Sequence, residues 1–275
     1  MDFSARRRAL QRVLSESLSL VRKFGETSEP NFSENVTGFV ERLRELANQL
    51  EDPQSVPPNP EFPGYTGYSL WAEDYDNLDG NPVVAAEGVV LNELIGEVAG
   101  LRVLDVGCGT GRHSIPLAES GAQVMGVDPT PEMLEKAKSK AEKQGMDVDF
   151  RGGSIEDVGP ELGNYDIVLC CLVLSHVKHL ADAVGRLADR LAPGGRLIIT
   201  DFHPVNILVG FRTSFTVSDT KYIVPNYLHL PSDYFTELLN QGLNLTAFHE
   251  IGAYDTFPGF PQTLILMAEK PETGG

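Results

Sequence analysis

The segment that most restricts the fold of this chain is residues 103–111 (VLDVGCGTG), in which an apolar run ends in three alternating glycines. An apolar, β-branched run of this kind is typical of a buried strand. Gly107, Gly109 and Gly111 can adopt positive φ angles and let a ligand approach the backbone closely. A helix beginning directly after them would add free N–H groups and a partial positive charge. The segment therefore predicts a strand, a tight ligand-binding turn and a helix.

Strands and helices alternate along the rest of the chain. We expect strands at residues 101–106, 123–128, 148–151, 165–174, 196–202, 243–251 and 263–269, and helices at 82–100, 112–120, 131–144, 180–191 and 232–241. Buried strands that alternate with helices imply a parallel sheet covered on both faces. The last two strands have no helix between them and imply an antiparallel pair at one edge. The predicted fold class is α/β, with a doubly wound, mostly parallel sheet of seven strands.

The chain divides into three predicted regions. Residues 1–52 show two apolar stripes at helical spacing and predict an N-terminal helical extension, which could pack on the main domain or form a homodimer. Residues 53–69 contain a proline-rich run and predict an extended linker. Residues 70–275 form the main domain, in which residues 204–231 are expected to be an inserted hairpin or cap.

Charge and cysteine content exclude several classes of protein. The formal net charge of −17 would repel nucleic acid, and the arginines near the N-terminus (Arg6, Arg7, Arg8 and Arg12) are interpreted as a solvated helix face. No apolar run approaches the roughly twenty residues that a membrane span needs. Cys108, Cys170 and Cys171 suggest no disulfide framework and no zinc-like spacing, so we expect no metal and a cytoplasmic, reducing location.

The acidic residues beside the glycines indicate the kind of ligand. A dinucleotide fingerprint needs G-x-G-x-x-G, whereas here the third glycine comes one residue early. Asp105 would repel a pyrophosphate and attract a cation. Asp128, at the end of the next strand, is placed to bind ribose hydroxyls; alternatively, it caps the helix that begins near Pro131.

These segments together resemble a known family. Residues 104–111 (LDVGCGTG), 127–128 (VD) and 131–137 (PEMLEKA) are similar to class I S-adenosylmethionine-dependent methyltransferases of the small-molecule type. Residues 165–177 and 191–201 are similar to the family's fourth strand and the turn into its fifth strand. The resemblance covers about residues 70–270. It implies a Rossmann-like methyltransferase fold, S-adenosyl-L-methionine as cofactor and methyl transfer as the reaction.

The resemblance also implies roles for particular residues. Asp105 and Gly107 would hold the amino group of the cofactor's methionine arm, in a loop with Cys108, Gly109 and Gly111. Asp128 would bind the ribose, and Leu172 would line the methionine arm. The adenine would be contacted on its faces by Pro129 and Met133 and at its edge by Ser154 and Ile155. Tyr75 matches an aromatic residue that closes over the cofactor. Many relatives have aspartate at the position of Ser154, so Glu156 or Asp157 could make that contact instead.

Methyl transfer from a sulfonium is an in-line displacement, so the protein mainly positions the acceptor and excludes water. A hydroxyl or acidic carbon acceptor usually needs a base. His203, after the fifth strand, is the candidate base, with Tyr75 as a second catalytic candidate. His176 lies at the same rim and could shape the cofactor pocket or cap a helix. Tyr65, Tyr68 and Trp71 could roof the site or pack the linker.

Three functions remain open from the sequence. The leading hypothesis is methyl transfer to a small-molecule acceptor at an unresolved N, O or C atom. The second is a protein or RNA methyltransferase that uses the N-terminal helices for recognition. The third is a non-catalytic protein that binds S-adenosylmethionine.

Overall fold

The computed structural model describes residues 64–76, 82–208, 212–218, 220–252 and 261–272. The predicted N-terminal extension at 1–52, the homodimer expected through it, and residues 53–63 of the predicted linker lie outside these residues.

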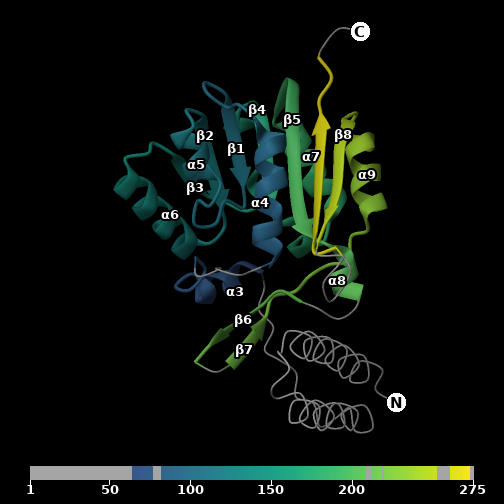
Figure 1. Cartoon of the computed structure of the whole chain (residues 1–275). Helices are drawn as coiled ribbons and strands as arrows, with labels where there is room; N and C mark the ends of the chain where they lie inside the picture. The colour runs from purple at the N-terminus through teal and green to yellow at the C-terminus, as the bar shows by residue number, and fades with distance from the viewer. Residues whose placement is uncertain (1–63, 77–81, 209–211, 219, 253–260, 273–275) are drawn as a thin grey trace, which may run out of the picture.

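The centre of the molecule is a twisted sheet of seven strands among the described residues, in the order β3-β2-β1-β4-β5-β9-β8 (Figure 1). The strands are β1 Arg102–Val106, β2 Gln123–Asp128, β3 Asp149–Gly152, β4 Tyr165–Cys171, β5 Leu191–Phe202, β8 Asn244–Ile251 and β9 Thr263–Glu269. β1 to β5 pair in parallel, whereas β9 runs antiparallel to both β5 and β8. The predicted fold class and the antiparallel edge pair are confirmed.

Helices cover both faces of the sheet (Figure 1). The helices are α4 Pro82–Ile95, α5 Ser114–Glu119, α6 Pro131–Gln144, α7 Leu180–Asp189 and α9 Pro231–Asn240. Leu91 of α4 and Leu117 of α5 share one apolar cluster with β1 and β4. Val184 of α7 and Leu238 of α9 share another cluster, on different side chains of the same strands. Because β4 is buried on both sides, its sequence is an almost continuous apolar run.

Several predicted boundaries were wrong; β5, for example, begins at Leu191 and not at Arg196. The helix before β1 ends at Ile95, not at Gly100, because Gly96 adopts φ 63° and stops it. β4 ends at Cys171, and a short 3₁₀-helix, η5 (Leu174–His176), follows where the sequence suggested continued strand. α9 begins at Pro231, one residue before the predicted start at Ser232, and its N-cap is Leu230. Two further 3₁₀-helices, η3 (Ile155–Asp157) and η4 (Pro160–Leu162), lie between β3 and β4.

Two segments lie at the carboxyl ends of the central strands, at the bottom of Figure 1. Helix α3, Gly64–Trp71, occupies the end of the predicted linker, so residues 64–69 are helical and not extended. The insertion 204–231 contains α8 (Pro204–Leu208) and an antiparallel hairpin, β6 (Ser214–Val217) and β7 (Thr220–Ile223). In the described part of the chain, no helix combines the length and apolar character needed to cross a membrane.

Candidate active site

The glycines after β1 form a tight loop at the carboxyl end of that strand. Gly107, Gly109 and Gly111 have φ angles of 76°, 53° and 81°, which side chains of L-residues rarely adopt. At Gly107 an added Cβ would lie 2.2 Å from Cγ2 of Val173. Both the backbone conformation and the close contact therefore require glycine at position 107.

Asp128 ends β2 beside this loop. Its Oδ2 accepts a hydrogen bond from the N–H of Gly109 at 2.9 Å, and its Oδ1 accepts one from the N–H of Thr130 at 2.8 Å. Burial raises the pKa of this carboxyl, while the two N–H groups lower it. Asp128 is not the N-cap of α6, which is Thr130, but its carboxylate holds the backbone that leads into the helix and also lines the cavity.

Asp105 lies within β1, directly before the loop. It is 1% exposed and accepts a hydrogen bond from Oγ of Ser114 at 2.6 Å. Burial raises the pKa of Asp105 to about 6. A cation bound nearby would favour the charged form and lower that pKa. The carboxyl is thus suited to a cationic ligand group, although Asp105 is not among the described residues that line the cavity.

A cavity of about 420 Å³ lies over the carboxyl ends of β1, β2 and β4. This is the point where successive connections change direction across the sheet, the usual ligand position in open α/β folds. It is lined by the following predicted site residues: Tyr75, Gly107, Gly109, Asp128, Pro129, Met133, Ser154, Ile155, Leu172 and His176. Cys108 instead packs with Ile115 and Phe150 in an apolar cluster, and Gly111 contributes its turn conformation.

Leu172 and Ser154 both line the cavity, and Leu172 does so with an unusual backbone conformation. Leu172 has φ 59°, and its N–H donates to the carbonyl of Thr200 at 2.8 Å. Such a conformation in a non-glycine residue is costly and often marks a functional site. The hydroxyl of Ser154 donates to Oδ2 of Asp157 at 2.9 Å. Asp157 is therefore occupied within the protein, whereas Glu156 lines the cavity.

Aromatic residues of α3 and the hairpin roof the cavity. Trp71 stacks on Phe215 of β6 with ring centroids 5.3 Å apart and planes at 9°. Trp71 also stacks on Tyr68 at 5.8 Å, and Tyr75 meets Trp71 edge-on at 5.1 Å. Tyr68 and Tyr75 line the cavity. Tyr68 therefore covers the cavity, which was one of the two predicted alternatives. Trp71 joins α3 to the hairpin through its stack on Phe215. The side chain of Tyr65 lies outside the described residues.

Hydrogen bonds and ion pairs also hold the turn after α3 against the glycine loop and α6. Thr110 Oγ1 donates to Oδ1 of Asp76 at 2.6 Å. Lys140 pairs with Oδ2 of Asp76 at 3.0 Å, and Lys136 pairs with Glu73 at 2.6 Å. Exposed pairs of this kind contribute little stability individually, but together they fix where the turn after α3 lies.

His203 does not have the position expected of a base. Its Nδ1 accepts a hydrogen bond from the N–H of Val205 at 3.2 Å, and its Nε2 lies 2.9 Å from Oε1 of Glu250. The ring is buried and is not among the described residues that line the cavity. The structure therefore places His203 in the packing between the end of β5 and β8, which argues against the catalytic role predicted from its position after the strand.

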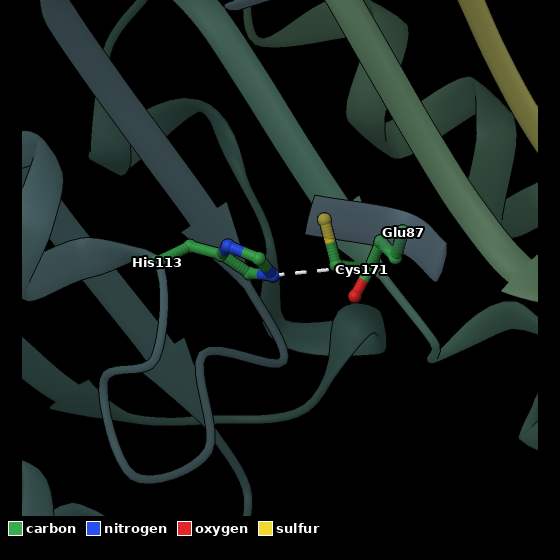
Figure 2. A group of neighbouring side chains, drawn as sticks. All are labelled: Glu87, His113 and Cys171. Carbon is green, nitrogen blue, oxygen red and sulfur yellow. Dashed lines mark ion pairs between the residues drawn. The ribbon is translucent and has the colours of Figure 1, made fainter. Parts of the chain in front are cut away.

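A cluster behind the glycine loop joins three elements. Glu87 of α4, His113 before α5 and Cys171 of β4 each offer a possible metal-ligand atom within 4.8 Å of the others (Figure 2). Arg112 and the hydroxyl of Thr200, however, both donate hydrogen bonds to the Glu87 carboxylate. We therefore interpret the cluster as a structural contact that holds α4 against the glycine loop and β5.

The titration of His113 supports this assignment. Burial lowers its pKa to about 3, so its imidazole is neutral near pH 7. The 3.9 Å contact between its Nε2 and Oε1 of Glu87, dashed in Figure 2, therefore carries no ion pair at that pH. The charge of Glu87 is balanced by Arg112. Sequence analysis missed this arrangement because Glu87 lies in a mostly apolar helix with no motif around it.

The site fits S-adenosylmethionine better than a dinucleotide. A positive-φ loop passes close to the ligand space, and two buried carboxyls, Asp105 and Asp128, lie beside it. Buried carboxylates favour a cation and hydroxyl donors, whereas a pyrophosphate would be repelled.

Comparison with known proteins agrees with this geometry. Residues 103–195 match the family described as methyltransferase domain. A ubiquinone biosynthesis O-methyltransferase of Bradyrhizobium sp. (strain ORS 278) is 42% identical over 103 residues, which are 38% of this chain and 40% of that protein. One of Xanthomonas euvesicatoria pv. vesicatoria is 41% identical over 105 residues, 38% of this chain and 44% of that protein. The chain thus spans about two fifths of the length of the curated relatives it matches.

Solved structures extend the likeness over the whole domain. An S-adenosylmethionine-dependent methyltransferase from Listeria monocytogenes has a TM-score of 0.58 at 25% identity, covering 69% of this chain and all of that one. A magnesium protoporphyrin IX methyltransferase from Synechocystis PCC 6803 with bound SAH has a TM-score of 0.56 at 26% identity, covering 75% of this chain and 95% of that one. The sequence match over residues 103–195, the sheet order and the site geometry agree with one another, and all three are typical of class I S-adenosylmethionine-dependent methyltransferases.

Proposed function

We propose that this chain transfers the methyl group of S-adenosylmethionine to a hydroxyl oxygen of a small, largely apolar acceptor. One observation carries the proposal: the cavity joins two chemically different ends. Asp128 and the glycine loop, with Tyr75 beside Gly109, form one end, whereas Tyr68, His176 and Tyr227 lie together at the other. The first end suits a nucleoside with a cationic arm, and the second suits a compact acceptor that binds by ring stacking.

The names of the relatives support oxygen as the acceptor atom, because the matched proteins are O-methyltransferases of ubiquinone biosynthesis. The family match at 103–195 does not reach α3 or the hairpin. The size and apolar character of the acceptor therefore rest on the cavity of this chain. An aromatic roof over a space of about 420 Å³ favours a small molecule over a protein or RNA segment.

The roles of the side chains are part of the same proposal. Asp128 binds the ribose hydroxyls, and Asp105 attracts the ammonium of the methionine arm. Met133 and Pro129 contact the adenine faces, and Leu172 supports the methionine arm. S-adenosylmethionine, when bound, supplies an activated methyl group, and the protein orients the acceptor and excludes water.

The proposal is tested by calorimetric titration with S-adenosylmethionine, followed by methyl transfer from the labelled cofactor to three acceptor classes. We expect transfer to a catechol such as 4-methylcatechol, and none to a small primary amine or to RNA. Transfer to RNA would establish the alternative, and cofactor binding with no transfer to any class would favour a non-catalytic binder.

Asp128→Ala should weaken cofactor binding by about 1–3 kcal/mol, the scale for a lost buried hydrogen-bonding partner. Asp149→Ala, on the neighbouring strand β3, is the matched control, because Asp149 is exposed and pairs only locally with Arg151. Equal affinity in Asp128→Ala and the control would remove the ribose role.

We also propose a cytoplasmic location and a homodimeric assembly for this protein. Cys108, Cys170 and Cys171 are free and buried, which suits the reducing cytoplasm. A homodimer through residues 1–52 rests on the apolar stripes of that segment. Light scattering of the full chain, compared with a variant carrying Leu43→Glu and Leu46→Glu on one stripe, would show whether the segment joins two copies.

A further inference from the structure

Two polar side chains meet at the acceptor end of the cavity. Tyr68 comes from α3 and His176 from η5, and both line the cavity. Oη of Tyr68 lies 3.0 Å from Nε2 of His176, and the rings meet edge to face with centroids 5.5 Å apart. The two residues therefore form a hydrogen-bonded pair on the surface that an acceptor would contact.

The direction of this hydrogen bond follows from the other ring nitrogen. Nδ1 of His176 lies 2.7 Å from the carbonyl oxygen of Pro225, and a carbonyl can only accept. Nδ1 therefore carries the hydrogen. Burial lowers the pKa of His176, so the ring is neutral and Nε2 has a free electron pair. The hydroxyl of Tyr68 must be the donor, which leaves its oxygen able to accept a further hydrogen bond.

The surroundings can stabilise a positive charge on His176. Asp201, at the end of β5, is fully buried, accepts a hydrogen bond from Oη of Tyr234 at 2.6 Å, and acts on His176 electrostatically. The other titratable groups acting on the pair are Tyr75, after α3, and Asp128, at the end of β2. A protonated imidazole would thus be held between the Pro225 carbonyl and a buried carboxyl.

We propose that Tyr68 and His176 form a proton relay that removes the acceptor hydroxyl's proton during methyl transfer; this rests on the function proposed above. The acceptor O–H donates to Oη of Tyr68. As that proton moves to Tyr68, the tyrosine's own proton passes to Nε2 of His176. Tyr68 ends neutral, the imidazole becomes positively charged, and its proton later leaves to solvent.

The step balances in charge as well as in atoms. The bound cofactor supplies the methyl group: the bond from sulfur to methyl breaks, the new O–CH₃ bond forms, and the sulfur keeps the electron pair and loses its positive charge. His176 gains one positive charge in the same step. The total charge in the cavity is therefore unchanged, which favours transfer within a site shielded from water.

The first test is independent of turnover. In ¹⁵N-histidine-labelled protein at pH 7.5, the His176 signals, assigned by their loss in His176→Gln, should show a neutral ring with hydrogen on Nδ1. Tyr68→Phe should shift the Nε2 signal, because that nitrogen loses its donor. A ring with hydrogen on Nε2 would overturn the relay, since it could not accept the proton of Tyr68.

The second test compares two acceptors of different acidity, 4-methylcatechol, which is neutral at pH 8, and the more acidic 4-nitrocatechol, which is ionised at that pH. With the first, Tyr68→Phe and His176→Gln should each lower kcat roughly 10²–10⁴-fold, the usual contribution of a positioned base. With the ionised acceptor the loss should shrink to within about tenfold, because no proton remains to be removed. Affinity for S-adenosylmethionine should stay within about twofold of wild type, since in this proposal both side chains contact the acceptor and not the cofactor.

Tyr165→Phe is the matched control. It removes a hydroxyl bonded to the carbonyl of Leu162, at the opposite end of β4. Equal losses with both acceptors, or undiminished turnover in Tyr68→Phe, would overturn the relay while leaving the proposed function intact. A wild-type protein that binds no S-adenosylmethionine would instead overturn the proposed function.

Discussion

The two ends of the cavity are built in different ways. At the cofactor end, Asp128 bonds the N–H of Gly109, only 19 positions away in sequence. At the acceptor end, Tyr68 and His176 are 108 positions apart, and His176 is oriented by Pro225, 49 positions further on. The glycine loop and Asp128, at the centre of the first end, lie within one strand–helix–strand unit. The second is assembled from three separate segments that the sheet brings together.

This difference suggests that cofactor binding and acceptor binding can be changed separately. Substitutions in the glycine loop should act on the affinity for S-adenosylmethionine, whereas substitutions in the roof should act on the acceptor. The following predictions test this separation, beginning with the largest expected effect.

Gly107→Ala should weaken S-adenosylmethionine binding at least about tenfold. The positive φ angle costs an alanine about 1–2 kcal/mol, and the new Cβ would lie 2.2 Å from Val173. Gly145→Ala is the control, because Gly145 has φ 67° at the end of α6 with open space around it. It should lower the melting temperature but not the affinity measured by calorimetry. Wild-type affinity in Gly107→Ala would show that the loop does not hold the cofactor.

The affinity for S-adenosylmethionine should fall about tenfold between pH 7.5 and pH 5, since the ionised form of Asp105 attracts the ammonium group and its pKa is about 6. Asp105→Asn should flatten this dependence in calorimetric titrations. A similar slope in Asp105→Asn would assign the pH effect to another group.

The same carboxyl should affect stability in the opposite direction. The folded protein holds the Asp105 proton more tightly than the unfolded chain does. Without cofactor, the free energy of unfolding should therefore decrease as pH rises from 3.8 to about 6, by on the order of 3 kcal/mol for this group. Urea unfolding of wild type and Asp105→Asn across that window would measure the difference.

Trp71→Leu should have the smallest effect, and it should act on the acceptor end alone. Losing the stack on Phe215 removes about 0.5–1.5 kcal/mol of packing between α3 and the hairpin. We expect a severalfold higher KM for the catechol and an unchanged dissociation constant for S-adenosylmethionine. Phe248→Leu disrupts a comparable pair with Phe235 on β8 and α9 and should leave both constants unchanged. A weaker cofactor affinity in Trp71→Leu would break the separation of the two ends.

The same contrast explains what could be predicted from the sequence. The glycine loop and Asp128 were identified because strand, turn and acid follow one another within one short segment. The role of His203 was inferred from position after a strand, and this failed because Glu250, on a distant strand, holds the ring. The pairing of Tyr68 with His176 has no sequence signal, since it depends on where a short helix before the domain packs.

The stack of Trp71 on Phe215 has a practical consequence for changing what this protein accepts. Because this stack joins helix α3 to the β6–β7 hairpin, we expect these two stretches of the sequence to be exchangeable only as a pair. Transferring only one of the two stretches from a relative would leave Trp71 or Phe215 without its matching ring. A chimera designed to take a new acceptor should therefore transplant both stretches together and leave the glycine loop untouched.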